Sequence, residues 1–211
     1  MADFMQTVKD AILKMPSVMR NKAAGDWFKG KVSDAVSGIR IAKPEQNFST
    51  AQNFAKTAEQ KTIRAGDMFM FVYDAKHKAT LPYYDTFPLI FPISVGKNSF
   101  IGLNLHYLNP SDRAQLFDKL LELRNNDKFD KTTKLKLSWQ LVKNVSVLVE
   151  PTVHEYLFSQ VRSKFIKVSP ADWKWVVFLP FDNFVKGANK EKASRGQVWR
   201  DSKLKSKGKK P

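Results

Sequence analysis

Three histidines and a scatter of carboxylates are the residues of this chain that could do chemistry. His77, His106 and His154 stand in different segments, and no His, Asp or Glu follows any of them by three or four positions, as a metal site on one helix would require. The chain has no cysteine, which excludes disulfides, zinc ribbons and thiol catalysis. It also has neither a glycine-rich loop followed by Lys and Ser/Thr nor a Gly-x-Ser-x-Gly turn. We therefore expect no catalytic residues, no metal, no cofactor and no small-molecule substrate.

The carboxylates leave one enzyme class open, a metal-dependent nuclease. Asp74, Asp85 and Asp172 could converge on a divalent cation, and Asp74 and Asp172 each lie two positions before a lysine. Such Asp-x-Lys triplets are common by chance, and Asp172 also fits the first turn of a helix. We therefore expect a protein that is not an enzyme, and we keep the nuclease as an alternative.

Charge is a stronger signal of function than any of these residues. The net charge is +16 in 211 residues, and repulsion among so many cations opposes folding. DNA is the polyanion that best accounts for this excess, with an anionic membrane surface or an acidic protein as alternatives. Residues 186–211 hold ten Lys/Arg against two acids, and we expect them to form a basic, largely disordered tail, above all from Ser202 onward.

Cations beside aromatic residues indicate where nucleic acid would bind, because bases stack on aromatic rings while Lys and Arg hold phosphates. The predicted nucleic-acid-binding residues are Arg162, Lys164, Lys167, Lys174, Arg195, Trp199, Arg200, Lys203, Lys205, Lys207, Lys209 and Lys210. The predicted base-stacking residues are Tyr83, Tyr84, Trp173 and Trp175. Core packing is the alternative for Trp173 and Trp175, and Trp199 could instead anchor the tail on the body.

Residues 63–185 have the pattern of a folded α+β body, beginning with its strands. Residues 68–73 form a short aromatic run typical of a buried strand, and residues 89–91, between two prolines, predict an edge strand. Residues 101–107 alternate apolar and polar side chains, which predicts a strand with one buried face and one solvent-facing side. Further strands are predicted over residues 165–168 and 176–179.

The helices of the body are indicated by their start signals. Asn109 before Pro110 predicts one helix, residues 169–172 predict the start of a short one, and the capping-box spacing of Thr152 and Glu155 predicts another through about Arg162. Residues 132–146 fit both a strand and a helix, and we assign them to a helix. The predicted fold is a small, mostly antiparallel sheet or open barrel with three or four packed helices.

Residues 1–62 are predicted to form a helical appendage followed by a linker over residues 43–62. Pro16 should end the first helix near Met15. The apolar stripe of that helix fits either docking on the protein's own core or contact with a membrane or a partner. No apolar run reaches the roughly 18–20 residues of a membrane span and no signal-peptide pattern is present, so we expect a soluble, cytosolic protein. The stripe consists of Phe4, Val8, Ile12, Met15 and Met19.

Several strings in residues 64–204 are distinctive. They are Asp74 with Leu81-Pro82-Tyr83-Tyr84-Asp85-x-Phe87-Pro88, Gly102-Leu103-Asn104-Leu105-His106-Tyr107-Leu108, Val161-Arg162-Ser163-Lys164-Phe165, Phe178-Leu179-Pro180, and Val198-Trp199-x-Asp201-Ser202. Together they resemble the DNA end protector family of T4-like tailed bacteriophages.

This resemblance implies a virion protein that binds the ends of the linear genome and shields them from exonuclease. Its partners would be DNA ends and other virion proteins, and its location the host cytoplasm during assembly and then the virion. The resemblance implies no catalytic residues. The alternative is a structural neck, tail or baseplate component whose basic tail contacts DNA or an acidic neighbouring subunit.

Overall fold

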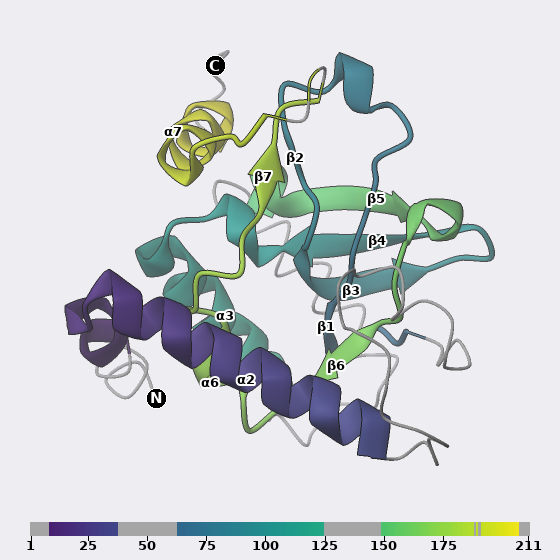
Figure 1. Cartoon of the computed structure of the whole chain (residues 1–211). Coiled ribbons are helices and arrows are strands. Elements are labelled where there is room, and N and C mark those ends of the chain that lie inside the picture. Colours follow the sequence, from purple (N-terminus) through teal and green to yellow (C-terminus); the bar gives the residue numbers. More distant parts are fainter. Residues whose placement is uncertain (1–8, 38–62, 125–148, 188, 190, 207–211) are drawn as a thin grey trace.

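The structure is a computed structural model that describes residues 9–37, 63–124, 149–187, 189 and 191–206 (Figure 1). Its strands are β1 (Met68–Met70), β2 (Tyr84–Asp85), β3 (Leu89–Val95), β4 (Ser99–Asn104), β5 (Val153–Leu157), β6 (Ile166–Val168) and β7 (Phe184–Val185). The α-helices whose bounds the structure describes are α2 (Ser17–Ser37), α3 (Pro110–Arg124), α6 (Trp173–Val176) and α7 (Arg195–Ser206). A further helix precedes α2. Short 3-10 turns are η2 (Lys78–Thr80), η3 (Leu105–Tyr107), η4 (Glu150–Thr152) and η5 (Phe158–Gln160).

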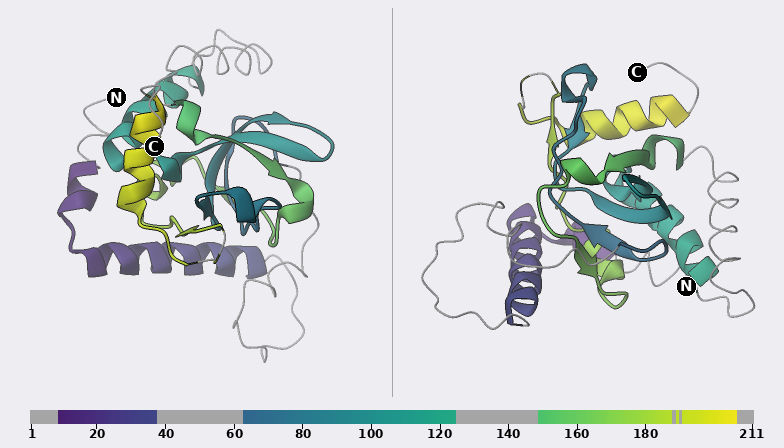
Figure 2. Two further views of the ribbon diagram at one scale, coloured as in Figure 1. Left: turned by 90° about the horizontal axis from the view of Figure 1, so that it is seen from above. Right: turned by 90° about the vertical axis from the view of Figure 1, so that its right-hand side faces the viewer.

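Five strands form one open antiparallel sheet in the order β5-β4-β3-β1-β6, and β2 pairs with β7 in a separate two-stranded ribbon. In Figure 1, α2 lies across one end of the molecule, whereas α7 lies at the other end beside β7, and the right-hand view of Figure 2 shows the same separation. The predicted α+β class with an open, antiparallel sheet is therefore confirmed.

Both faces of the sheet are covered, and β1 shows this most clearly. Met68 and Met70 belong to the main core, whereas Phe69 and Phe71 belong to a second, aromatic cluster. Successive side chains of a strand point to opposite faces, so the apolar run of β1 serves two cores at once. A third cluster lies under α7 and contains Tyr83, Tyr107, Phe184, Ala193 and Val198.

Several predicted elements are confirmed. A strand begins at Met68, another covers residues 166–168, and a short helix follows Asp172. The side chain of Asn109 accepts hydrogen bonds from the backbone N–H of Ser111 (2.9 Å) and Asp112 (3.1 Å), as expected for a residue that caps α3. The first helix ends at residue 14, before Pro16, and Ile12 is buried in the main core.

The predicted edge strand at residues 89–91 is wrong, because β3 lies inside the sheet between β1 and β4. Proline is tolerated there for a local reason. The register with β4 shifts between Pro92 and Ser94, and proline occurs at such irregularities as well as at edges.

Two other assignments are also wrong. Residues 153–157 form β5, not a helix, since they pair with five residues of β4 and the Thr152 hydroxyl donates to the carbonyl of Val149 (2.7 Å). Residues 176–179 are not a strand, because helical turns continue there: the N–H of Val177 donates to Trp173 O (3.2 Å). In both places tertiary burial outweighs the local pattern. The helix predicted over 132–146 and the linker over 43–62 lie outside the described residues.

The polar side chains of residues 101–107 do not face solvent as predicted. The buried carboxylate of Asp85 lies against them and binds Asn104 and His106. Asp85 accepts hydrogen bonds from His106 Nδ1 (2.7 Å), Asn104 Nδ2 (3.2 Å) and the backbone N–H groups of Phe87 (3.0 Å) and Asn183 (3.3 Å). Burial acts to raise the pKa of Asp85, but His106 and these hydrogen bonds outweigh it and lower the pKa below its ordinary value.

We expect Asp85→Asn to destabilise the fold by about 3–5 kcal/mol at pH 7, because it leaves the rest of a buried charged network without its partner. The sign of the pH dependence follows from the lowered pKa. The carboxylate contributes stability above about pH 4 that is lost as the pH falls through its folded pKa. Urea unfolding at several pH values should therefore show the variant and the wild type converging in acid. Asp26→Asn, at an exposed position of α2, is the control and should change neither the free energy of unfolding nor its pH dependence.

Candidate nucleic-acid interface

Three of the predicted cations lie near β6, at the edge of the sheet. Arg162 is exposed and donates to Ser159 O (3.4 Å) and Gln160 Oε1 (3.3 Å). Lys167 is paired with Asp67 (2.7 Å), and partial burial lowers the pKa of Lys164. These cations therefore lie in one region of the surface near β6. The charge of one of them, Lys167, is already neutralised by Asp67.

The predicted cations near the C-terminal end lie on α7, which is a docked helix. Arg195 pairs with Asp182 (3.0 Å) and Lys203 lies 3.8 Å from Asp112, whereas Arg200 and Lys205 are exposed. The expected disorder from Ser202 onward is therefore wrong as far as Ser206. Lys207, Lys209 and Lys210 lie outside the described residues.

Trp199 and Val198 explain why α7 is ordered. Val198 has no exposed surface, and Trp199 donates from Nε1 to the backbone carbonyl of His106 (2.9 Å). The Arg113 guanidinium lies 5.6 Å from the centre of the Trp199 ring. Trp199 is thus the anchor of this segment on the body, which was one of the two alternatives for it.

Arg113 connects this anchor to the core. Its guanidinium is buried and donates to the carbonyls of Leu108 (2.6 Å), Val177 (3.1 Å) and His106 (3.2 Å). Burial lowers the pKa of Arg113 to about 10, so it stays charged at neutral pH. The helix that carries the exposed cations is therefore fixed to a charged group inside the protein.

The two tryptophans of α6 have different environments. Trp173 is 1% exposed, donates to Val168 O (3.0 Å) and packs against Phe91 and Phe117, which removes it from the base-stacking candidates. Trp175 is 42% exposed, and Lys174 Nζ lies 5.6 Å from its ring centre. Of these two tryptophans, only Trp175 therefore has an exposed aromatic face beside a cation.

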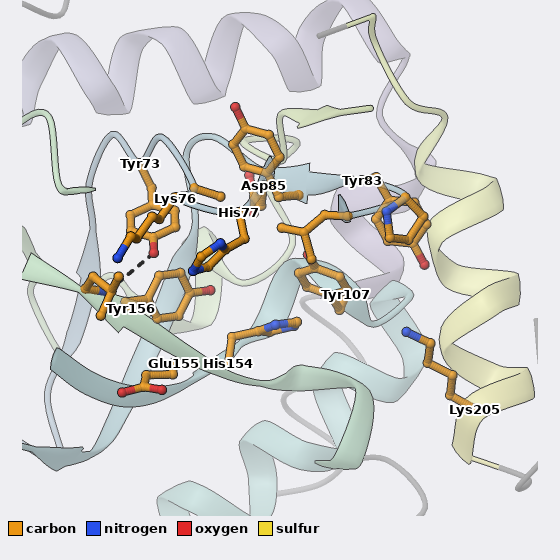
Figure 3. Close-up of a pocket in the computed structure, with 15 residues that line it drawn as sticks. Tyr73, Lys76, His77, Tyr83, Asp85, Tyr107, His154, Glu155, Tyr156 and Lys205 are labelled. Carbon is orange, nitrogen blue, oxygen red and sulfur yellow. Dashed lines mark hydrogen bonds between the residues drawn. The ribbon is translucent and has the colours of Figure 1, made fainter. Parts of the chain in front are cut away.

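Tyr83 and Tyr84 line a cavity of about 520 Å³ that the sequence did not indicate. In Figure 3, the rings of His77, Tyr107, His154 and Tyr156 lie around a common space, and Lys205 reaches toward it from α7. The lining residues are Tyr73, Ala75, Lys76, His77, Leu81, Pro82, Tyr83, Tyr84, Asp85, Tyr107, His154, Glu155, Tyr156, Leu157 and Lys205.

The aromatic side chains of this cavity are uncharged at neutral pH. Burial raises the pKa of Tyr107 and Tyr156 well above 10, and burial with a hydrogen bond to Asp74 (3.1 Å) raises the pKa of Tyr84 to about 12. Burial also lowers the pKa of His154 to about 4, so its ring is neutral at pH 7. The charged groups of the site are the buried carboxylate of Asp85, which is bound to His106, and the exposed lysines Lys76 and Lys205 at the rim.

Residues 76–82 form the rim segment of the cavity, and residues from another part of the chain pack against it. Gly187 packs so closely on the backbone carbonyls of Lys78 and Leu81 that a Cβ would collide with both. Lys78 is bound to Asp74 (2.8 Å). The chain after β7 therefore fixes the wall of the cavity.

The candidate carboxylates of a nuclease have other roles in the structure. Asp85 is buried in the network with His106, Asp74 binds Lys78 and Tyr84, and Asp172 precedes α6. In the part of the chain that the structure describes, no three His, Asp or Glu residues are grouped as a metal site. The described carboxylates therefore give the nuclease alternative no support.

These features define an α+β protein with a cationic helix and a tyrosine-lined cavity at the same end of the molecule. The chain belongs to the phage T4 terminal DNA protecting protein family, whose model matches residues 48–202. No curated protein and no solved structure shows a significant match. Among the described residues, no helix has the length and apolar character needed to cross a bilayer.

We expect Trp199→Ala to lower the free energy of unfolding by about 3 kcal/mol, because it removes the ring that anchors α7. Trp199→Phe keeps most of the packing and loses the hydrogen bond to His106, at a cost of about 1 kcal/mol. Trp175→Ala, at an exposed position, is the matched control and should change stability by less than about 0.5 kcal/mol. Urea unfolding followed by circular dichroism measures all three. Equal stability of Trp199→Ala and the control would show that α7 does not depend on this anchor.

Proposed function

We propose that this chain is a phage virion protein that binds the ends of the linear genome and protects them from exonuclease. The family match over residues 48–202 is the observation that carries the proposal. The net charge of +16 supports it, because phosphate contacts supply most of the affinity of proteins for DNA. The protein would act without catalysis, in the host cytoplasm during assembly and afterwards in the virion.

The exposed cations of α7 are the proposed phosphate-binding surface. Arg200 and Lys205 are exposed, and Lys203 lies near Asp112 yet keeps 60% of its side chain exposed. A helix held rigidly on the core presents these charges in a fixed arrangement, which lowers the entropy lost on binding. Arg162 and Lys164 form a second group of cations near β6.

A structural role in the virion is the second candidate, and apolar residues near the N-terminus favour it. Leu13, Met15, Val18 and Met19 are all exposed, Val18 by 76%. Apolar side chains gathered on a surface are typical of a protein contact. Other virion proteins are therefore proposed partners under either candidate. DNA ends are the partner of the first, and the basic tail of the second would contact DNA or an acidic neighbouring subunit.

Protection of ends separates the two candidates. At about 0.15 M salt, where exposed charges are screened beyond about 8 Å, one or a few molecules per end should protect linear duplex DNA from a processive exonuclease. Closed circles of equal length should compete poorly for the protein. If protection requires enough protein to coat the whole duplex, the end-binding proposal fails and the structural candidate is favoured.

The contribution of α7 can be measured through salt. Replacing Arg200, Lys203 and Lys205 together by Ala should reduce the slope of log K against log salt by about 2 to 3, because each phosphate contact contributes about 0.9. The control replaces Lys22, Lys29 and Lys97, which are exposed elsewhere and change the net charge equally. An identical slope for both triple variants would place the phosphate contacts outside α7.

A further inference from the structure

We propose that the tyrosine-lined cavity binds a single unpaired nucleobase at the terminus of a linear duplex. The inference rests on the proposed function and assigns the part of the molecule that distinguishes an end from the interior. It concerns described residues of β2, η3, β5 and α7, and of the loops on either side of η2.

The walls of the cavity have the chemistry that a base requires. The rings of Tyr107 and His154 are 4.3 Å apart with an interplanar angle of 35°, and Tyr83 packs 6.1 Å from Tyr107. His77 is exposed at the opening and presents a further ring. Every base has a face that can stack on such rings, independent of sequence. A volume of about 520 Å³ lies within the roughly 300–1,000 Å³ typical of small-molecule sites.

The charges around the cavity favour a base over a phosphate as its occupant. Asp85 lines it, and Asp74 lies against the hydroxyl of Tyr84. These carboxylates would repel a phosphate inside the cavity, whereas the amino groups of bases can donate hydrogen bonds to oxygen acceptors. Lys76 and Lys205 lie at the rim, where the phosphate that follows an inserted base would pass.

The buried floor of the site explains why it would select ends. The cavity floor is formed by buried tyrosines, so a base can reach it only after leaving the duplex stack. Extrusion of an interior base costs a few kcal/mol of pairing and stacking, and the cost is least where a base is already unpaired. A terminal pair loses one stacking neighbour, and it frays without disturbing the rest of the duplex. The same cavity thus binds ends more readily than interiors.

Fluorescence of a terminal base tests the proposal directly. A short duplex closed at one end by a hairpin carries 2-aminopurine at the 5′ or 3′ terminal nucleotide of its open end, or at an interior position. The full-length protein should change the emission of at least one terminal probe and leave the interior probe unchanged. His77→Ala should weaken binding to the open duplex about 10-fold, as expected for the loss of one stacking ring, while a duplex closed by hairpins at both ends is bound as before. Val95→Ala is the control, because its side chain is exposed on β3 and does not line the cavity, and it should behave as the wild type.

Photo-crosslinking of the wild-type protein keeps the test independent of folding defects. A 5-iodouracil at the terminal position should crosslink to residues 73–84 or 154–157. Crosslinks confined to Trp175, or terminal probes that do not respond although open duplexes are preferred over closed ones, would overturn the cavity assignment and leave end binding intact. Equal affinity for open and fully closed duplexes would overturn the proposed function itself.

Discussion

The buried carboxylate of Asp85 is the interaction on which the rest of the structure depends. It lies in β2 and accepts hydrogen bonds from the end of β4, from η3 and from the segment before β7. The carbonyl of His106, the residue it binds most closely, accepts hydrogen bonds from both Arg113 of α3 and Trp199 of α7. One residue pair therefore joins the two-stranded ribbon, the large sheet and two helices. An isolated buried charge would be prohibitively costly, and its four donors offset this cost only in one arrangement of these elements.

This arrangement brings the cationic helix and the cavity to the same end of the molecule. Val198 and Trp199 fix one face of α7 on the cluster of Tyr83, Tyr107 and Phe184, so the remaining face carries its cations outward. Two of those three aromatic residues also line the cavity. The packing that orders the helix is thus the packing that shapes the cavity wall, and the two sites cannot move independently.

Local signals allowed the elements of the body to be predicted where burial and propensity agree, as in β1, β6 and the start of α3. They failed where a residue's role is set by a distant partner. Thr152 and Glu155 have the spacing of a helix cap, yet pairing with β4 makes this segment a strand. The alternation of residues 101–107 was recognised, but its polar side is buried because Asp85, some twenty residues earlier, lies against it. Charge counting found the cations of residues 195–205, whereas the apolar content of that segment, chiefly Val198 and Trp199, was too low to predict a docked helix. The cavity could not have been predicted at all, since its walls come from segments between residues 73 and 205.

In the proposed function, DNA-end recognition combines two tasks, and different residues of the structure would perform them. Lysines and arginines on exposed surfaces attract any duplex, and their contribution falls with salt in the same way for linear and circular DNA. They cannot by themselves distinguish an end, because every phosphate along the duplex presents the same charge. A neutral aromatic surface has the opposite properties: it gains little from long-range attraction, and it binds only bases that have left the stack. The phenols of Tyr84, Tyr107 and Tyr156 keep their protons at neutral pH, and His154 stays uncharged, so the rings of the cavity keep this neutral character beside a helix of cations. Affinity and selectivity for ends would then arise from different residues of one protein, which is why substitutions in α7 and in the cavity should affect open and closed DNA differently.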